Sequence, residues 1–419
     1  MKRIHRITRR RFMKASLAAG AAFTVVPRHV LGQEGQAPPS ETLGGALIGV
    51  GGRGPGTYNT MTESLQNAGF GVSKLAECDV RWVGRADNKT RYTDFRRLLE
   101  RRDIDVVAIA TPPHWHALIS IAAMEAGKDV LCEKPMTRFI SEGRAVAEAE
   151  QRYGRVFQIG TFGRFGASGD AGNRRTRKIM TSGLLDPCPG VAIKSGGHKI
   201  KEWSGFVNMR PRPIPESLDW DMYCGPSPLK PFHPHRVGGT HRGYWDYEGG
   251  GLCDMGQHAL DPLLWIWGKD VTAPVQAEAH APPAHHESCG MWGWVELTYA
   301  DGFTLVFDSR EWGEPYSRKQ SRGIGPDDLS EENRAKLRDL PDPGPLLSFG
   351  EAVRQRRPAG GNAEAAQRTI TAIHLMNLAI RLGRKIKFNP QTEQIVGDDL
   401  ANRLVNPPMR APWQMPTLT

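Results

Sequence analysis

Between residues 44 and 165, short apolar runs alternate with helix-forming stretches, and this alternation limits the fold more than any other feature of the chain. The apolar run at 105–110 is unbroken, as is typical of a strand buried on both faces. Strands that alternate with helices form parallel sheets covered by helices. We therefore predict a doubly wound α/β domain, with strands at 46–50, 73–78, 105–110, 129–131 and 155–160.

A glycine-rich loop follows the first predicted strand directly. The residues Gly49, Gly51, Gly52, Arg53 and Gly54 belong to a segment that fits G-x-G-x-x-G. Its glycines permit a tight turn, the close approach of a pyrophosphate and close packing of the next helix. The motif alone is weak, but its place between a strand and a helix predicts a dinucleotide site.

An acidic residue ends the second predicted strand. Asp79 lies 25 positions after Gly54, slightly more than the usual spacing of about 20. A carboxylate at this point accepts hydrogen bonds from the adenosine ribose hydroxyls, which favours NAD over NADP. Arg81 stands close enough to leave NADP open. An ordinary turn aspartate is the alternative interpretation.

Polar residues follow the strands at 105–110 and 129–131. The carboxyl ends of parallel strands face the ligand crevice of such a sheet, and Pro135 ends its strand because proline has no N–H to donate. We predict that Lys134 meets a substrate hydroxyl there, although a surface Glu–Lys pair is an alternative. Candidate contacts to the dinucleotide at these strand ends are Thr111, Pro112, His116, Glu133 and Lys134.

A second group of reactive side chains lies at 244–261, after a stretch from 166 that is rich in Gly, Pro and Arg. Asp254 and His258 are spaced i, i+4 and share one face of a predicted helix. They form a general acid/base pair, a metal site or a helix-stabilising pair. We expect no metal, because no convincing third and fourth ligands are present. Candidate stacking residues for a sugar ring, which would look the same as core aromatics, are Tyr244, Trp245 and Tyr247.

The chain begins with features of an export signal. Paired arginines at 9–11 precede a short alanine-rich stretch at 15–26, which is too short for a stable membrane-spanning helix. We predict a twin-arginine signal peptide at 1–32, an extended arm at 33–43 and a periplasmic protein without stable membrane insertion. Export after folding suits a protein that acquires a tightly bound cofactor in the cytoplasm.

Length and composition set further limits. A chain of 419 residues favours two domains, which we place at 44–165 and 166–419. The net charge of +10 is scattered, and no basic helix with interleaved aromatics suggests a nucleic-acid partner. The six cysteines include no CxxC pair, which argues against a zinc site and a dense disulfide framework.

The ordered segments GVGGRG, DVVAIATPPHWHA, AGKDVLCEKP and EGGGLCDMGQHALD resemble the glucose–fructose oxidoreductase, inositol dehydrogenase and rhizopine-catabolism (Gfo/Idh/MocA) family, over nearly all of residues 44–413. The C-terminal LAIRLGRKIKFNP and RAPW segments resemble its secreted bacterial members. The resemblance implies a nicotinamide-binding domain followed by an α/β domain with an open, largely antiparallel mixed sheet that mediates oligomer contacts, in a dimer or tetramer. It also implies that Lys134 assists proton transfer and that Asp254 and His258 complete the site.

Three functions fit these features. The leading one is an NAD(P)-dependent oxidoreductase acting on a hydroxyl of a sugar, sugar derivative or cyclitol, with His258 as base, Lys134 stabilising negative charge and Asp254 orienting the hydroxyl or the histidine. The second is an NAD-dependent glycosidase that oxidises its substrate transiently, eliminates the aglycone and regains its cofactor. The third, a non-catalytic sugar-binding relative, is disfavoured because the glycine motif, Lys134 and His258 are all present.

Overall fold

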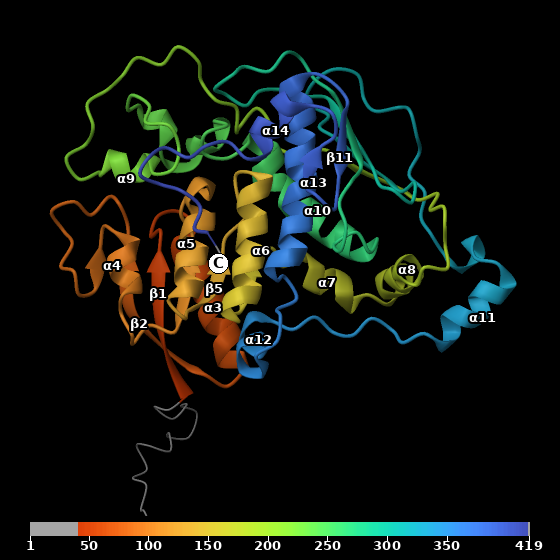
Figure 1. Cartoon of the computed structure of the whole chain (residues 1–419), viewed down its shortest axis with the longest axis horizontal. Coiled ribbons are helices and arrows are strands. Elements are labelled where there is room, and N and C mark those ends of the chain that lie inside the picture. The colour runs from red at the N-terminus through yellow and green to blue at the C-terminus, as the bar shows by residue number, and fades with distance from the viewer. Residues whose placement is uncertain (1–40, 418–419) are drawn as a thin grey trace, which may run out of the picture.

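The structure, a computed structural model, describes residues 41–417, and within them the chain forms two six-stranded sheets (Figure 1). The first sheet is parallel throughout, with strand order β3-β2-β1-β4-β5-β6. This order confirms the predicted doubly wound fold. Its strands are β1 (Thr42–Ile48), β2 (Gly71–Cys78), β3 (Arg91–Tyr92), β4 (Val106–Ile109), β5 (Asp129–Cys132) and β6 (Phe157–Ile159).

The predicted signal peptide lies outside the described residues, and so does most of the predicted arm at 33–43. Both therefore stay predictions. Thr42 and Leu43, which we had assigned to the arm, form the start of β1.

Helices cover both faces of the first sheet because its central strands are apolar on both sides. On β4, Val106 and Ala108 belong to a core with α3 (Gly54–Asn67) and α12 (Phe349–Gln355). Val107 and Ile109 point the other way, into the core shared with α5 (His116–Glu125). The other helices of this part of the chain are α4 (Phe95–Leu99) and α6 (Ile140–Tyr153), and the 3-10 turn η2 (Pro113–Trp115) precedes α5.

The second sheet is mixed, with order β12-β11-β8-β9-β10-β7. All its neighbours pair antiparallel except β10 and β7, which are parallel. This confirms the expected largely antiparallel mixed sheet. Its strands are β7 (Val191–Ser195), β8 (Gln276–His280), β9 (Trp294–Thr298), β10 (Thr304–Asp308), β11 (Ile386–Asn389) and β12 (Gln394–Ile395).

The stretch after residue 166 is more regular than its composition suggested. Its Gly, Pro and Arg content favours irregular structure, but the stretch contains the edge strand β7 and the helix α8 (Ala171–Thr181). The short run that forms β7 is flanked by Pro and Gly, and it becomes a strand by pairing with β10, more than 100 residues later. The remaining helices and turns among the described residues are α7 (Gly163–Gly169), α9 (Trp220–Cys224), η3 (Pro234–Arg236), η4 (Gly238–Gly243), η5 (Pro326–Asp328), α11 (Glu331–Asp339) and α14 (Asp399–Val405).

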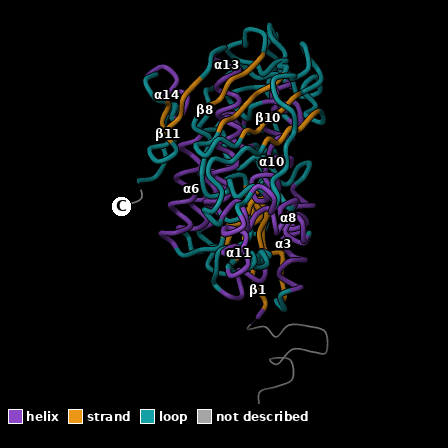
Figure 2. Tube along the Cα trace, turned by 90° about the vertical axis from the view of Figure 1, so that its right-hand side faces the viewer, coloured by secondary structure: helices purple, strands orange, loops and turns teal. Residues whose placement is uncertain are grey.

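Two long helices join the sheets into one body. The helix α13 (Ala363–Leu382) contacts α6 on one side, and α10 (Gly250–Ile266), β8 and β9 on others. The helix α13 is buried over most of its circumference because these elements surround it. Figure 2 shows β8 and β10 of the second sheet in the upper part of the molecule and β1 of the first sheet in the lower part. One continuous hydrophobic core therefore runs from the first sheet through α13 to the second.

Residues 311–322 cross the outer face of the second sheet, away from α13. Tyr316 packs with Trp294 and Val306 in a small separate cluster, and its hydroxyl donates to Glu296. Arg318 donates to a carboxylate on β8 at 2.9 Å and stacks over Trp294. Part of the face that the family resemblance assigns to oligomer contacts is thus covered by the chain itself.

A buried ion pair anchors α10. Arg164, on α7, donates to both carboxylate oxygens of Asp261, at 2.9 and 2.5 Å, and the two side chains are 1% and 0% exposed. Thr161 and Thr369 donate hydroxyl hydrogen bonds to the same carboxylate. These contacts fix α10 against α7 and α13, and α10 also carries the predicted site residues Asp254 and His258.

We predict that Arg164→Met lowers the free energy of unfolding by about 3–5 kcal/mol, because it leaves the Asp261 charge buried without its partner. The urea midpoint, followed by circular dichroism, measures the loss. The control is Arg97→Met, which removes an exposed ion pair with Glu100 and is expected to cost less than about 1 kcal/mol. Equal effects of the two changes would contradict the structural role of the buried pair.

Candidate active site

A cavity of about 1020 Å³ opens between the carboxyl ends of the first sheet and the loops of the second half of the chain. Its walls come from the glycine loop, from the ends of β2, β4 and β5, and from η4 and α10. Such a volume accommodates a dinucleotide-sized ligand together with a small substrate. The predicted residues that line it are Gly49, Gly51, Gly52, Arg53, Asp79, Thr111, Pro112, Glu133, Lys134 and His258.

The glycine loop has the backbone that the motif predicts. Gly49 has a φ of +89°, and a Cβ on it would stand 2.6 Å from the backbone at Ala110 and Thr111. A Cβ on Gly54 would stand 2.1 Å from the carbonyl oxygen of Gly49, so this position needs glycine for the helix α3 to start here. Gly52 has a φ of +50° and open space beside it. The loop is therefore tight on its inner side and open toward the cavity, which fits a bound pyrophosphate.

Asp79 stands at the end of β2 as predicted. Its carboxylate accepts hydrogen bonds from Val50 N at 3.0 Å and from the Arg81 guanidinium at 2.8 and 2.7 Å. Burial alone would raise the pKa of Asp79, but the hydrogen bonds from Arg81 and Val50 outweigh it and leave the pKa below its ordinary value. The carboxylate is therefore an ionised acceptor, with the Arg81 cation in the same part of the cavity.

Glu133 ties the end of β5 to the glycine loop. One of its oxygens accepts hydrogen bonds from Thr57 Oγ1 at 2.7 Å and from Arg53 Nε at 3.1 Å. The other accepts from the backbone N–H of Lys134 at 3.1 Å. These contacts hold Lys134 at a fixed position relative to the predicted phosphate loop.

His116 does not line the cavity, in contrast to its predicted contact with the dinucleotide. It is 1% exposed, and its ring nitrogens lie 2.8 Å from the carbonyl oxygen of Pro135 and 2.7 Å from that of Thr111. The side chain therefore links the chain segments after β4 and β5. It supports the residues around the site instead of touching the ligand.

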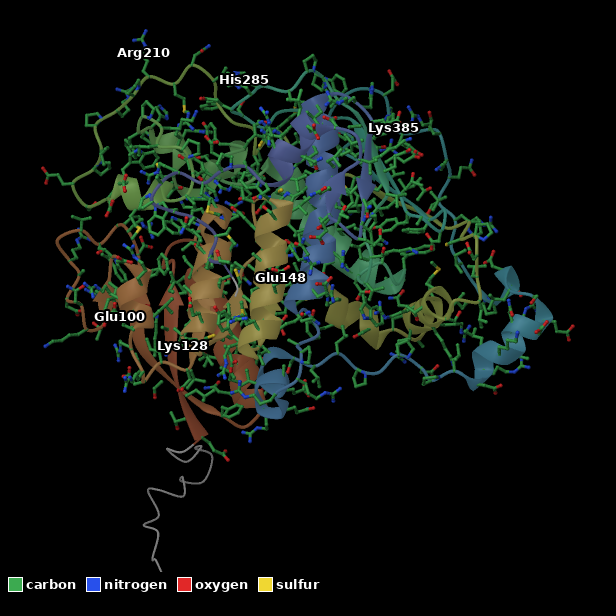
Figure 3. All side chains as sticks on the ribbon, viewed as in Figure 1. Glu100, Lys128, Glu148, Arg210, His285 and Lys385 are labelled. Atoms are coloured by element: carbon green, nitrogen blue, oxygen red, sulfur yellow. The ribbon has the colours of Figure 1, made fainter. Side chains whose placement is uncertain are left out.

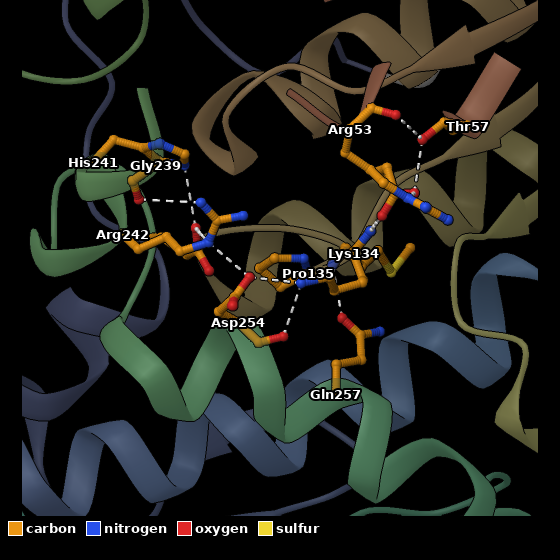
Figure 4. A network of polar contacts seen from close by, with 12 residues as sticks. Arg53, Thr57, Lys134, Pro135, Gly239, His241, Arg242, Asp254 and Gln257 are labelled. Carbon is orange, nitrogen blue, oxygen red and sulfur yellow. Dashed lines mark hydrogen bonds and ion pairs between the residues drawn. The ribbon is translucent and has the colours of Figure 1, made fainter. Parts of the chain in front are cut away.

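Lys134 meets Asp254 across the two halves of the chain (Figure 4). Its Nζ donates to Asp254 Oδ1 at 2.6 Å and to the Asp254 carbonyl oxygen at 3.0 Å. The two side chains are 11% and 6% exposed. Arg242 Nε donates to the same Oδ1 at 2.7 Å. Burial alone would raise the pKa of Asp254, but these two cations outweigh it and leave the pKa below its ordinary value.

His258 lies one turn along α10 from Asp254 and lines the cavity, where its side chain is open to solvent on one side and partly enclosed by the cavity walls. Its ring makes no hydrogen bond to any residue between 41 and 417, so the predicted contact with Asp254 is not formed. Partial burial, followed by the positive charge of Lys134, lowers the pKa of His258 below its usual 6.5. A neutral ring with a free nitrogen therefore faces the ligand space near neutral pH.

The predicted substrate-stacking residues Tyr244, Trp245 and Tyr247 are not at the cavity. Tyr244 and Tyr247 are fully buried in an aromatic cluster, and the indole N–H of Trp245 donates to the carbonyl oxygen of His285 at 2.9 Å. This part of the prediction is wrong. Buried aromatics and ligand-stacking aromatics have the same sequence signature, and burial against the segment around α9 decides between them here.

Among the histidines and the charged residues that line the cavity, three were missed, namely His241 and Arg242 of η4 and Glu248. His241 Nε2 lies 3.3 Å from Glu248 Oε2, and Arg242 Nε lies 3.9 Å from the same oxygen. Glu248 directly precedes the glycines at 249–251, and His241 and Arg242 lie seven and six residues before Glu248. Their signal was a cluster of charged residues next to a glycine run, but sequence spacing alone does not show that they line the cavity.

Comparison with known proteins assigns both halves of the chain. The description "Oxidoreductase family, NAD-binding Rossmann fold" matches residues 45–161, and "Oxidoreductase family, C-terminal alpha/beta domain" matches residues 170–415. The chain belongs to the Gfo/Idh/MocA family. The family supports a nicotinamide cofactor, for which the glycine loop and Asp79 provide a fitting cradle.

Relatives with curated names match this Gfo/Idh/MocA protein over part of its length. Inositol 2-dehydrogenase of Salmonella typhimurium is 32% identical over 153 residues, which are 34% of this chain and 43% of that protein. A glycosyl hydrolase family 109 protein of Shewanella baltica is 30% identical over 177 residues, 36% of this chain and 38% of that protein. The matched part of the chain spans less than half the length of each.

The solved structure of the WlbA dehydrogenase from Bordetella pertussis, in complex with NADH and UDP-GlcNAcA, has a similar fold. The TM-score is 0.51 at 13% identity, over 83% of this chain and 99% of that one.

None of the helices between residues 41 and 417 combines the length and the apolar character that a membrane span requires. In the same range, no group of three or more His, Cys, Asp and Glu side chains is placed to hold a metal, and all six cysteines are buried and free.

We predict that Asp79→Ala weakens NAD binding by about 10- to 100-fold, because hydrogen bonds to a charged acceptor contribute about 1.5–3 kcal/mol. NADP binding is expected to fall less, since the change also frees Arg81 from its carboxylate partner. Isothermal titration with each nucleotide measures both effects. Asp103→Ala, an exposed carboxylate outside the cavity, is the control. A larger loss for NADP than for NAD would show that NADP is the native cofactor.

Proposed function

We propose that this protein is an NAD(P)-dependent oxidoreductase that oxidises a hydroxyl of a sugar, sugar derivative or cyclitol, with NAD as the favoured and tightly held cofactor. One observation carries the proposal. The Lys134 ammonium, fixed by Asp254, stands in the wall of a cavity that begins at the glycine loop and also contains His258. His258, as a proton acceptor, and the Lys134 cation thus line the same cavity as the glycine loop proposed to bind the nucleotide.

A nicotinamide nucleotide held by the glycine loop and Asp79 would supply the hydride acceptor for the carbon that is oxidised. Charge stabilisation and proton transfer are carried out by side chains of the protein itself. Lys134 Nζ has two of its N–H groups engaged by Asp254 and has a third to donate to the substrate oxygen, where negative charge develops. A free ring nitrogen of His258 takes the hydroxyl proton. Asp254 holds Lys134 in place through these contacts and does not orient the histidine.

A glycosidase is the second candidate, supported by the similarity to the glycosyl hydrolase family 109 protein. It would use the same oxidation transiently and regain its cofactor within the site. The non-catalytic alternative has less support, because the glycine loop, Lys134 and His258 all line one cavity.

The other parts of the proposal concern the environment of the protein. We infer that it is exported through the twin-arginine route to the periplasm, on the basis of the arginine-rich start of the sequence. We also infer a homo-oligomer from the family resemblance. Because residues 311–322 occupy part of the outer sheet face, its contacts would have to include these residues.

The central test is to purify the protein without added nucleotide, release any bound cofactor by denaturation, and assay the holoprotein. We expect bound NAD(H), and oxidation of at least one of D-glucose, methyl β-D-glucopyranoside and myo-inositol with stoichiometric NADH formation. Lys134→Ala is expected to lower kcat by about 100- to 10,000-fold. Cleavage of nitrophenyl glycosides without net NADH formation would favour the glycosidase, and full activity of Lys134→Ala would refute the proposed chemistry.

The pH dependence of kcat/KM tests the role of His258. A base must be neutral to act, so activity falls as the pH drops through its pKa. Because burial and Lys134 lower that pKa, the acid limb is expected below pH 6.5. Removing the Lys134 charge removes one cause of the shift, so Lys134→Ala should move the His258 titration to higher pH. NMR of ¹³C-labelled histidine, assigned with His258→Gln, follows it independently of turnover, and an unchanged titration would contradict this account.

A further inference from the structure

Arg242 has the geometry of a substrate-binding residue, although the sequence did not single it out. It lies on η4, lines the cavity and is 24% exposed. Its guanidinium stacks over the ring of Trp203, with 4.7 Å between the guanidinium carbon and the ring centroid. A cation supported on an aromatic face loses little conformational freedom when it binds a ligand.

Two of the three guanidinium nitrogens of Arg242 are held by the protein. Nε donates to Asp254 Oδ1 at 2.7 Å, and Nη1 donates to the carbonyl oxygen of Gly239 at 3.1 Å. The third nitrogen, Nη2, makes no hydrogen bond within residues 41–417. Figure 4 shows the free end of the guanidinium pointing into the space between Asp254 and the strand-end residues of the first sheet.

The same carboxylate oxygen orients both cations. Asp254 Oδ1 accepts from Lys134 Nζ at 2.6 Å and from Arg242 Nε at 2.7 Å, so the two donors are neighbours. Each retains N–H groups without a protein partner. Two donors that share one acceptor oxygen can each bind one of two oxygen atoms on adjacent carbons of a ring.

We propose that Arg242 binds the oxygen on the carbon next to the one that is oxidised, so that the enzyme requires a vicinal diol. This inference rests on the proposed function and adds a specificity residue to it. Lys134 holds the reacting oxygen, and Arg242 Nη2 donates to its neighbour. The pair thereby fixes which carbon of the ring is presented for oxidation.

The charges around Arg242 favour a neutral oxygen over a carboxylate of the substrate. Asp254 contacts both Lys134 and Arg242, and the Glu248 carboxylate lies 3.9 Å from Arg242. Two negative groups therefore already balance two positive ones. An anionic substrate group would have to displace or oppose Glu248, whose side chain is 1% exposed, whereas a hydroxyl needs only the free N–H groups.

The test compares methyl β-D-glucopyranoside and myo-inositol with monodeoxy analogues that lack one hydroxyl next to the oxidised carbon, which is identified by NMR of the product. The wild-type protein is expected to prefer the parent over one such analogue by at least 30-fold in kcat/KM, because the missing hydroxyl leaves a donor unpaired. Arg242→Met is expected to reduce this preference to less than 3-fold, mainly through KM for the parent, and Arg242→Lys should give an intermediate ratio.

Two controls keep the outcomes distinct. Arg210→Met removes an arginine that projects outward from an exposed loop (Figure 3) and should leave the preference unchanged. NAD binding by Arg242→Met, measured by titration, should equal that of the wild type, which shows that the variant is folded. A full preference retained in Arg242→Met, or a wild type that oxidises parent and analogues equally, would overturn the role of Arg242. Absence of polyol oxidation by the wild type would instead overturn the proposed function itself.

Discussion

The buried contact between Lys134 and Asp254 is the interaction on which the site depends. A lysine and an aspartate taken out of water lose several kcal/mol of hydration each, and their attraction compensates only if the geometry is good. Here Lys134 Nζ donates to the carboxylate and to the backbone carbonyl of Asp254, and Arg242 Nε donates to the same carboxylate. Lys134 follows β5 of the first sheet, whereas Asp254 lies on α10 in the second half of the chain. The pair is therefore formed only when the two halves of the chain are correctly docked.

That docking is fixed by the packing around α10 and α13. The Arg164–Asp261 pair holds α10 two turns beyond Asp254, and α13 fills the space between α6 and the second sheet. A helix buried over most of its surface has few alternative positions, since any shift opens cavities in a closely packed core. The position of Asp254 opposite Lys134 thus follows from contacts that are distant from the cavity.

The nucleotide side of the site was predictable because its signals are local. The glycines, Asp79, Glu133 and Lys134 each follow a strand directly, and parallel strands bring their carboxyl ends to one edge. The other wall was only partly predictable. Asp254 and His258 were found from i, i+4 spacing, but Arg242 approaches Lys134 through a 3-10 turn that no periodicity indicates. Tyr244 and Tyr247 were misassigned because burial of an aromatic depends on which segments pack against it, here the one around α9, and the local pattern does not show this.

The nucleotide wall of the site and the wall with Arg242 are held in place in different ways. The strand ends that hold the nucleotide form part of the first sheet and are fixed by its backbone hydrogen bonds. The wall with Arg242 consists of short turns held by side-chain contacts, such as Arg242 with Asp254 and the stacking on Trp203. Side chains in such turns change at little cost to the core, since loops carry few buried backbone groups. Recognition of the substrate can therefore vary on that wall, while Lys134 and the nucleotide cradle stay in place.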